Sequence, residues 1–229
     1  MRLDGRTIVV TGALGVLGRA VAAAAEAAGA RVARLDAAKP GVGGELVFEG
    51  LDLTDEAATA AAMAEVARAC GGIDGLANIA GGFVWRTVAE SPAPVWEQMF
   101  RINVLTAVAA SRAAAPFLKA SGHGAIVNVG AGAGARAAAG MAPYAASKSG
   151  VARLTEALAE ELAADGVRVN AVLPSIIDTP ANRSDMPKAD FSTWVRPDDI
   201  AGVIVFLLSD AAAAVTGAAV PVTRGRRAG

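Results

Sequence analysis

The chain has 229 residues, a length that suits a single domain, and 54% of them are hydrophobic, enough to fill a large core. The formal net charge of −1 and the pI of about 5.9 give no basic surface for nucleic acid, and the short basic run at Arg224, Arg226 and Arg227 is interpreted as a solvated tail. The single cysteine, Cys70, excludes an internal disulfide, and together with the single histidine, His123, it argues against a metal site.

The mean hydropathy of +0.43 raises the question of a membrane span. A spanning helix needs about 18 or more consecutive apolar residues, and charged, glycine or polar residues interrupt the apolar runs sooner. Alanine, a helix former, supplies much of the hydrophobicity, and the N-terminus shows no signal-peptide pattern. We therefore expect a soluble, cytoplasmic protein that binds neither a membrane nor a nucleic acid.

Short apolar segments alternate with alanine-rich helical segments along the whole chain. This alternation predicts an α/β fold in which a parallel sheet carries helices on both faces. No repeat or low-complexity linker divides the sequence, so residues 1–229 are expected to form one domain. In chain order, strands are expected at 6–12, 31–36, 44–53, 73–81, 124–130, 167–175 and 217–223, and helices at 16–30, 54–72, 94–121, 142–166 and 196–212.

Between the expected strand at 167–175 and the expected helix at 196–212, no further strand or helix is expected, so residues 174–196 are interpreted as a long loop. Loops of about 20 residues are uncommon in compact domains, and those that occur are usually functional. We therefore predict that residues 174–196 form a lid over a substrate site.

Three glycines, Gly12, Gly15 and Gly18, follow the first expected strand and open the first helix. Backbone N–H groups at such a helix N-terminus can approach a pyrophosphate closely. The Gly-x-x-Gly-x-x-Gly spacing differs from the usual dinucleotide fingerprint, and a simple tight turn would also explain it. By itself the glycine pattern is therefore weak evidence for a nucleotide site.

The end of the second expected strand strengthens the case for a nucleotide. Asp36 lies there, and its carboxylate can accept hydrogen bonds from ribose hydroxyls while repelling a 2′-phosphate. We therefore expect NAD(H) rather than NADP, with Arg34 and Lys39 close enough to weaken this preference. Asp52 and Leu53 end the third strand, in a position that suits the edge of an adenine ring.

The segments TGALGVLG, LDL, NIAG, INV, YAASK and LPSIIDTP occur in this order, and together they make the sequence resemble the short-chain dehydrogenase/reductase family over essentially its whole length. The resemblance implies a Rossmann-type, doubly wound sheet of about seven strands, a nicotinamide cofactor and a small-molecule substrate. It also implies a homodimer or homotetramer built through the two long helices. The cofactor is expected against Gly12, Leu14, Gly15, Val16, Leu17, Asp36, Asp52, Leu53, Asn78, Ala80, Gly81, Tyr144, Lys148, Pro174, Ile177 and Thr179.

The same resemblance assigns three catalytic residues. Tyr144 would be the general acid or base, Lys148 would bind the nicotinamide ribose and lower the pKa of the tyrosine, and Asn103 would support a water near the lysine. Tyr144 and Lys148 are four residues apart, so they share one face of a helix. A tyrosine ordinarily titrates near 10, and a neighbouring ammonium group favours the phenolate.

The serine that most family members carry 13 residues before the tyrosine is missing: Ala131 stands at that position. Such a serine donates a hydrogen bond to the substrate oxygen, and a preorganised donor of this kind typically contributes ~10²–10³ in rate. The sequence therefore predicts either a substrate that does not need the donor, or a replacement for it.

One branch of the family, which contains dihydropteridine reductase, resembles this sequence locally and tolerates alanine there. The resemblance rests on TGALGVLG, on AGGFVW and above all on LPSIIDTPANRSDMPKADFSTW. It implies an electron-poor, planar substrate that contacts Ala131 and stacks on Phe83, Trp85, Phe191 and Trp194. These aromatic residues would equally suit a core or a lid anchor. Two other features, Asn103 and the last expected strand, resemble the wider family and not this branch. Ser175 stands where a glycine usually follows Pro174.

Three functions remain open at this point. The first is an NAD(H)-dependent reductase of a quinonoid or similar planar substrate. The second is an ordinary carbonyl or alcohol oxidoreductase in which another group, such as Ser175 or Ser147, replaces the serine. The third is a protein that binds NAD and a partner without chemistry, against which the intact Tyr144, Lys148 and Asn103 argue.

Overall fold

The computed structural model describes residues 1–41 and 43–223, so the basic run at Arg224 to Arg227 lies outside the described residues. Within them, all strands join one parallel sheet in the order β3-β2-β1-β4-β5-β6-β7. This is the predicted doubly wound sheet, and the order reverses between β1 and β4, the point at which such sheets bind ligands. The strands are β1 (Thr7–Thr11), β2 (Arg31–Asp36), β3 (Val47–Glu49), β4 (Gly75–Asn78), β5 (Ala125–Val129), β6 (Arg168–Pro174) and β7 (Ala219–Val222).

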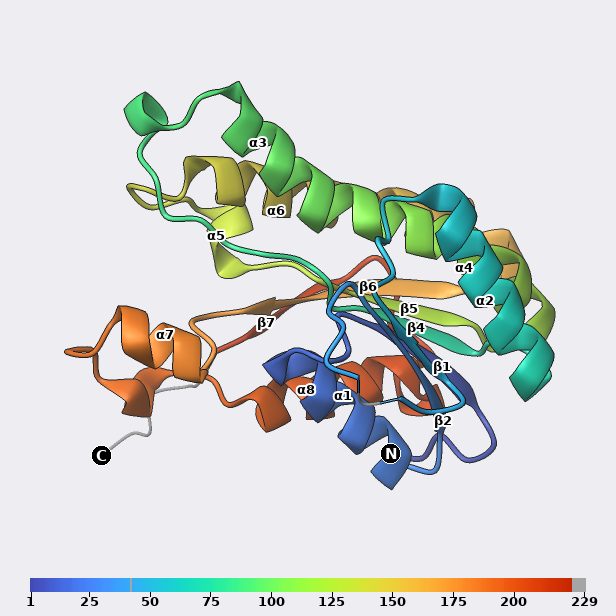
Figure 1. Cartoon of the computed structure of the whole chain (residues 1–229). Helices are drawn as coiled ribbons and strands as arrows, with labels where there is room; N and C mark the ends of the chain where they lie inside the picture. Colours follow the sequence, from blue (N-terminus) through green and yellow to red (C-terminus); the bar gives the residue numbers. More distant parts are fainter. Residues whose placement is uncertain (42, 224–229) are drawn as a thin grey trace.

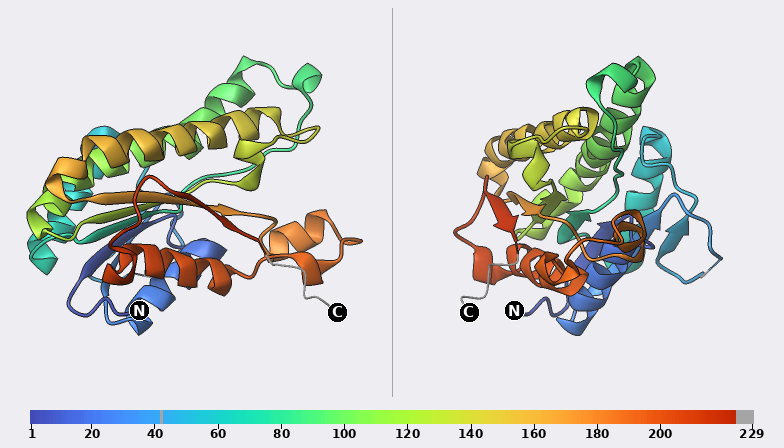
Figure 2. Two further views of the ribbon diagram at one scale, coloured as in Figure 1. Left: turned by 180° about the vertical axis from the view of Figure 1, so that it is seen from behind. Right: turned by 90° about the vertical axis from the view of Figure 1, so that its left-hand side faces the viewer.

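Helices cover both faces of the sheet, as Figures 1 and 2 show. α1 (Val16–Ala27) and α8 (Pro197–Leu208) pack on one face, and α2 (Glu56–Cys70), α4 (Thr106–Ser121) and α6 (Ala142–Glu161) pack on the other. Because both faces of the sheet are covered, the central strands are apolar and fully buried, as in β1 and β5.

α8 shows how the sequence produces this packing. Ile200, Ile204 and Leu208 lie four residues apart and are all 0% exposed, so they form one stripe against the sheet. Burial of each such side chain contributes ~1.5–3 kcal/mol to folding. Pro197 occupies the first turn, where its missing N–H costs no hydrogen bond.

The helix predicted at 94–121 is interrupted. The chain forms α3 (Ala93–Phe100), then a π-helical turn at Arg101–Leu105, and then α4. A π-turn inserts one extra residue into a helix and is frequent at functional sites. Asn103 lies at the centre of this turn.

The predicted lid at 174–196 is not structureless. It contains α7 (Pro180–Asp185), which Thr179 caps through a hydrogen bond from Asn182 N at 3.2 Å, and a 3₁₀ turn at Phe191–Thr193. A parallel bridge between Ile177 and Val195 ties its two ends together. The segment therefore projects from the sheet as a small folded unit (Figure 1).

The remaining elements are short. α5 (Gly132–Ala135) follows β5, and 3₁₀ turns cover Val88–Glu90, Ala163–Asp165 and Asp210–Ala212. α2 begins at Glu56, two residues after the predicted start of the helix at 54, because the Asp55 carboxylate caps the helix by accepting a hydrogen bond from Ala58 N at 3.0 Å. None of the described helices combines the length and apolarity that a membrane span requires.

Candidate active site

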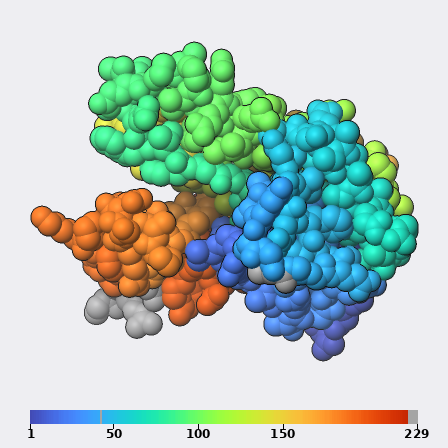
Figure 3. Space-filling model, in the orientation of Figure 1, coloured from blue at the N-terminus to red at the C-terminus, as the bar shows by residue number. Residues whose placement is uncertain are grey.

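The candidate site lies at the carboxyl ends of the strands, where the surface forms a hollow that we call the cleft (Figure 3). The chain leaves β4 toward α3, leaves β5 toward α5, and leaves β6 toward α7, so these segments surround one edge of the sheet. In the space-filling view, the surface is deeply hollowed between the segment that carries α3 above and the lid with α7 below (Figure 3). The predicted catalytic and cofactor residues belong mainly to the elements around this hollow.

The glycine-rich turn packs too closely for side chains. Gly12 adopts φ +60°, and a Cβ there would lie 2.9 Å from the Ala80 backbone. A Cβ on Gly18 would lie 2.1 Å from the Gly12 carbonyl oxygen. Gly15 is the exposed N-cap of α1, and no side chain caps the N–H groups of the first helical turn. The turn can therefore receive a pyrophosphate.

Asp36 is held against this turn. One carboxylate oxygen accepts a hydrogen bond from Leu14 N at 2.8 Å, and the other accepts one from Ala38 N at 2.8 Å. The carboxylate thus lies beside the loop where the resemblance places the adenosine ribose. The sequence-based prediction brought Gly12, Leu14 and Asp36 together, and the structure does the same.

Asp52 lies at the surface near the π-turn. Its carboxylate accepts hydrogen bonds from Thr54 and forms a 3.1 Å ion pair with Arg101. Hydrogen bonds from Thr54, followed by those from Arg101, lower the pKa of Asp52. The neighbouring Leu53 is buried at 4% exposure, so its side chain belongs to the core and only its backbone is available to an adenine ring.

The Tyr144–Lys148 pair begins α6. Lys148 is only 6% exposed, and its ammonium group donates a 2.7 Å hydrogen bond to the Val129 carbonyl at the end of β5. It also lies 5.9 Å from the centre of the Tyr144 ring. Burial lowers the pKa of Lys148 to about 8 and raises the pKa of Tyr144 to about 12. The direction for Tyr144 is opposite to the lowering expected from Lys148, because removal of the phenol from water disfavours its charged form. At neutral pH the lysine is therefore charged and the phenol is protonated.

The Asn103 side chain forms two hydrogen bonds with the backbone of Gly82, in the segment that follows β4. Its side-chain oxygen accepts from Gly82 N at 3.0 Å, and its Nδ2 donates to Gly82 O at 3.1 Å. A Cβ on the preceding Gly81 would lie 2.5 Å from the Asn103 Oδ1 and 3.5 Å from the Lys148 Nζ. Asn103, Gly81 and Lys148 therefore lie close together. The role of Asn103 in supporting a water near the lysine stays a prediction.

Ala131 is buried at the start of α5 and leaves no hydroxyl there. Two aromatic side chains stand nearby: the Phe83 ring meets the Tyr144 ring edge-on at 4.9 Å, and Trp85 packs over Gly140. Phe83 and Trp85 are 53% and 59% exposed, so both are available to a ligand.

Several predicted residues have other roles in the structure. Trp194 is 3% exposed and stacks at 4.7 Å on Phe191, whose ring also lies 4.7 Å from the Arg183 guanidinium, so the three side chains hold the lid together. Asn78 turns its Nδ2 toward Asn128 Oδ1 at 2.8 Å and Ser111 Oγ at 3.1 Å, inside the sheet–helix interface. In this structure the Trp194 and Asn78 side chains therefore pack inside the protein, and the roles expected for these residues at the substrate and the cofactor stay predictions.

Other predicted residues lie at the site only in part. Val16 is exposed at the mouth of the turn, whereas the Leu17 side chain is buried in the core. Pro174 ends β6, with its carbonyl oxygen 3.8 Å from the Cβ position of Gly132, so it borders the segment of Ala131. Ile177 and Thr179 lie in the lid.

Two residues were missed by the sequence analysis. Thr11 Oγ1 accepts hydrogen bonds from Ile79 N at 3.0 Å and Ala80 N at 3.2 Å, and so joins the glycine turn to the end of β4. Ser147, considered only as a substitute hydroxyl, links Asn103 to α6 instead. The role of Thr11 could have been found from its position directly before Gly12. Nothing in the sequence indicated the bond between Ser147 and Asn103.

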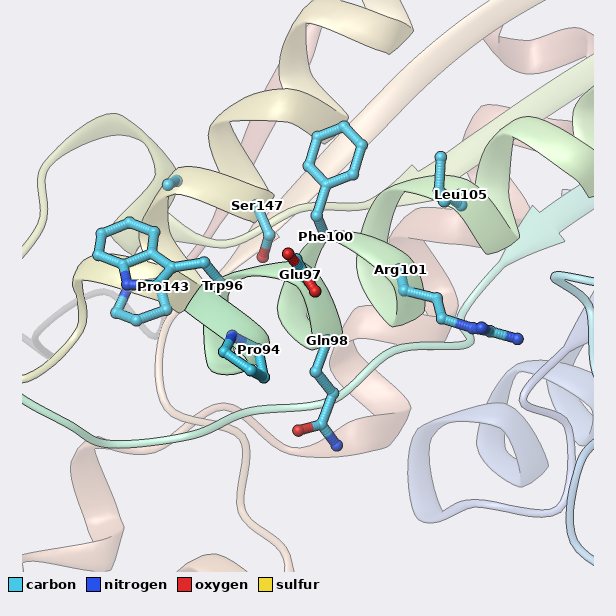
Figure 4. A pocket seen from close by; sticks show the side chains of 10 residues that line it. Pro94, Trp96, Glu97, Gln98, Phe100, Arg101, Leu105, Pro143 and Ser147 are labelled. Carbon is cyan, nitrogen blue, oxygen red and sulfur yellow. The ribbon is translucent and has the colours of Figure 1, made fainter. Parts of the chain in front are cut away.

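A second hollow lies away from the cleft, on the outer side of α3 and α6 (Figure 4). Its volume is about 830 Å³, and Trp96, Phe100, Leu105, Pro143 and Ser147 are among its lining residues. We call it the α3–α6 hollow. It is not where the catalytic groups meet, because Tyr144 and Lys148 do not line it.

The family model described as short chain dehydrogenase matches residues 6–190. The chain belongs to the short-chain dehydrogenase/reductase family. Members of the family take NAD or NADP. The cradle formed by the glycine-rich turn from Gly12 to Gly18 and the uncapped N-terminus of α1 fits the pyrophosphate of such a dinucleotide. The chain is therefore an enzyme of this oxidoreductase family.

Several named relatives are similar to the chain over nearly its whole length. The chain is 34% identical to 2-(S)-hydroxypropyl-CoM dehydrogenase 3 of Xanthobacter autotrophicus over 99% of this chain and 98% of the relative. It is 35% identical to the inactive 2-(S)-hydroxypropyl-CoM dehydrogenase 2 of the same organism, over 91% of this chain and the whole relative. It is 34% identical to meso-2,3-butanediol dehydrogenase of Serratia marcescens, over all of this chain and 97% of the relative. A crystal structure of gox2181 matches with a TM-score of 0.88 and 30% identity, over 96% of this chain and 95% of that one.

The absence of a side chain at Gly81 can be tested directly. Gly81→Ala places a Cβ 2.5 Å from Asn103 Oδ1, so we expect NADH affinity to fall at least ~10-fold, since small displacements at such sites have large effects. Gly202→Ala is the matched control, because a Cβ there meets nothing within 4 Å. Fluorescence titration with NADH and thermal melting of both variants measure the effect. Equal NADH affinity in the two variants, with equal melting temperatures, would contradict this account of the site.

Proposed function

We propose that this protein is an NAD(H)-dependent oxidoreductase that interconverts a small secondary alcohol and its ketone in the cleft between α3 and the lid. The observation that carries the proposal is the buried Tyr144–Lys148 pair at the carboxyl edge of the sheet, beside the glycine cradle. The relatives named for hydroxypropyl and 2,3-butanediol substrates support the alcohol class, because both names describe secondary alcohols.

This substrate class differs from the first hypothesis of the sequence analysis. The local resemblance favoured a quinonoid pteridine, whereas the relatives reported above are named for alcohols, and the alternative function is therefore the better supported one. A planar substrate remains the second candidate because one feature favours it. Ala131 provides no hydroxyl, while Phe83 and Trp85 expose flat aromatic surfaces beside Tyr144.

The roles of the residues follow from their geometry. A bound nicotinamide supplies the hydride in one direction and accepts it in the other. Tyr144 donates its phenolic proton to the ketone oxygen during reduction and takes the alcohol proton during oxidation. Because burial raises the pKa of Tyr144 to about 12, the phenol carries its proton at neutral pH and has it available for reduction. Oxidation requires the phenolate instead, which a neighbouring ammonium group favours. Lys148, charged below about pH 8, stabilises the phenolate that reduction leaves behind.

The buried lysine also argues against a protein that only binds NAD. The described partners of the Lys148 ammonium are the Val129 carbonyl and the Tyr144 ring, and neither is a carboxylate. A buried cation without a counter-charge lowers stability, so such groups concentrate at functional sites. One relative is described as inactive, and the assay below therefore includes this third possibility.

The preference for NAD over NADP rests on Asp36. Its carboxylate is fixed beside the loop by Leu14 N and Ala38 N, and a 2′-phosphate there would meet a negative charge. Arg34, which could have offset that charge, is paired with Glu26 at 2.7 Å. We therefore propose NAD(H) as the cofactor.

The burial of Ser147 and the exposure of Ser175 indicate which of the two could replace the missing serine. The Ser147 hydroxyl is buried and engaged by Tyr144 O and Asn103, so it cannot reach a substrate. Ser175 is exposed directly after Pro174, next to the segment that carries Ala131. Ser175 is therefore the better candidate for a second donor to a ketone oxygen.

The assay that tests this function is NADH oxidation with a panel of small ketones and with freshly generated quinonoid dihydropterin. We expect turnover of a ketone, slower with NADPH because of Asp36, and a loss of at least ~10²-fold in Tyr144→Phe because the proton donor is removed. Turnover of the dihydropterin alone would favour the second candidate. NADH binding without turnover across the panel would mean a non-catalytic protein.

Ala131→Ser refines the same assay. An added hydroxyl should raise ketone reduction, since a preorganised donor contributes up to ~10²–10³ in rate, and should leave reduction of the dihydropterin nearly unchanged. Ser175→Ala is expected to slow ketone reduction in the wild-type background and to matter less once Ala131→Ser is present.

The pKa of Lys148 predicts a pH dependence. A pKa lowered to about 8 means that the ammonium is charged below this value and neutral above it. We expect kcat/KM for NADH, which reports the free enzyme, to be level from pH 6 to about 7.5 and to fall above about pH 8. Lys148→Met should give low values with no such limb. An unchanged kcat/KM up to pH 9.5 in the wild type would contradict this role of the lysine.

We also propose that the protein is a homodimer or homotetramer that associates through the face of the α3–α6 hollow. Phe100 and Leu105 line the hollow and are 47% and 43% exposed, an apolar surface that association would cover. Light scattering should show an oligomer for the wild type and a smaller species for Phe100→Asp. Val88→Asp, at a 65% exposed position that is not among the lining residues, should not change the mass.

A further inference from the structure

Ser147 connects two elements that the sequence separates by more than 40 residues. It lies on α6 between Tyr144 and Lys148 and is 2% exposed. Its hydroxyl donates to the Tyr144 carbonyl oxygen at 2.7 Å and accepts from Asn103 Nδ2 at 3.0 Å. The serine therefore ties the π-turn to the part of α6 that carries both catalytic groups.

The hydrogen bonds of the Asn103 amide fix its orientation. Its Nδ2 donates both to Ser147 Oγ and to Gly82 O, and its oxygen accepts from Gly82 N. Reversing the amide would place its oxygen against the Gly82 carbonyl, so these partners fix one orientation. Gly82 precedes Phe83, whose ring contacts Tyr144. The network thus reaches Tyr144 both through its own helix and through the ring beside it.

The first turn of α6 needs such a connection. Met141 is the N-cap of the helix and provides no side-chain hydrogen bond, and Tyr144 lies in this first turn. The N–H groups of a first turn have no partners within the helix, so an uncapped end frays more readily. The bond between Ser147 and Asn103 holds the helix one turn further in.

We propose that Ser147 is a positioning residue for proton transfer: through its hydrogen bond with Asn103 it holds the first turn of α6 so that the Tyr144 hydroxyl and the Lys148 ammonium keep their places in the cleft. The proposal rests on the function proposed above. Ser147 touches neither substrate nor cofactor, because its hydroxyl is buried and has both of these partners inside the protein.

The chain provides a matched control two residues further along α6. Ser149 also places its hydroxyl on a backbone carbonyl, that of Gly134 at 2.5 Å. It does not bond to Asn103, and it follows Lys148 instead of standing between the two catalytic residues. Removal of this hydroxyl changes the side-chain volume by the same amount without affecting the link to the π-turn.

The first test does not depend on catalysis. Tyr144 is the single tyrosine of the chain, so a ¹³Cζ-tyrosine label gives one resonance that reports this group alone. In Ser147→Ala we expect the resonance to broaden or split, and the pKa of Tyr144 to fall from about 12 toward its ordinary value, because the looser turn admits water. In Ser149→Ala the resonance and the pKa should match the wild type.

The second test uses turnover of whichever substrate the panel identifies. Ser147→Ala should lower kcat ~10-fold or more with KM changed less than ~2-fold, because misplaced groups slow the reaction step without weakening binding. Ser147→Thr keeps the hydroxyl that bonds to Asn103, so it should restore kcat. Asn103→Ala combined with Ser147→Ala should be little worse than the poorer single variant, because both remove one link.

The outcomes separate the two proposals. A wild-type ¹³C resonance in Ser147→Ala, or equal changes in Ser147→Ala and Ser149→Ala, would show that Ser147 only packs, and would overturn this inference. A perturbed resonance without turnover in any variant would support the positioning role while refuting the proposed function.

Discussion

The buried ammonium group of Lys148 is the constraint around which the site is built. A charge in an apolar environment is unfavourable unless polar groups surround it. Here the Val129 carbonyl accepts a hydrogen bond and the Tyr144 ring offers its face, and Gly81 leaves room at 3.5 Å where a side chain would stand. The carboxyl end of β5, the start of α6 and the chain after β4 must therefore converge on one point, and the order of the strands permits this.

Much of the fold was predictable because it depends on repeated, local signals. The alternation of β-branched and alanine-rich segments indicated the parallel sheet, and the stripe Ile200, Ile204 and Leu208 illustrates why such signals are dependable. The interruption at Arg101–Leu105 was not predictable, because a π-turn keeps helical backbone geometry and an apolar pattern on both sides. The structure within 174–196 was missed for a different reason: its elements are only six and three residues long.

The candidate site, like the fold, was predictable from the sequence only in part. The positions of residues that depend on backbone or spacing, such as Gly12 and the Tyr144–Lys148 pair, agree with what the sequence indicated. The direction in which a side chain points could not be predicted in the same way. Trp194 and Asn78 were expected at the ligand, yet the first is buried within the lid and the second within the sheet–helix interface. Tertiary packing sets the direction in which a side chain points, and the order of residues in a motif does not reveal that packing.

The π-turn has a geometric consequence for the whole face of the molecule. Each residue of a regular helix advances the direction of its side chain by ~100°, so the extra residue of the turn rotates α3 relative to α4 by about that angle. Met99 is buried and Phe100 is exposed as a result of the direction that α3 takes. Deleting one residue from 101–105 would return the segment to a single regular helix. The apolar surface of α3 would then turn away from the α3–α6 hollow, and Asn103 would lose its place opposite Gly82. The chemistry inside the cleft and the surface outside it are thus set by the same inserted residue.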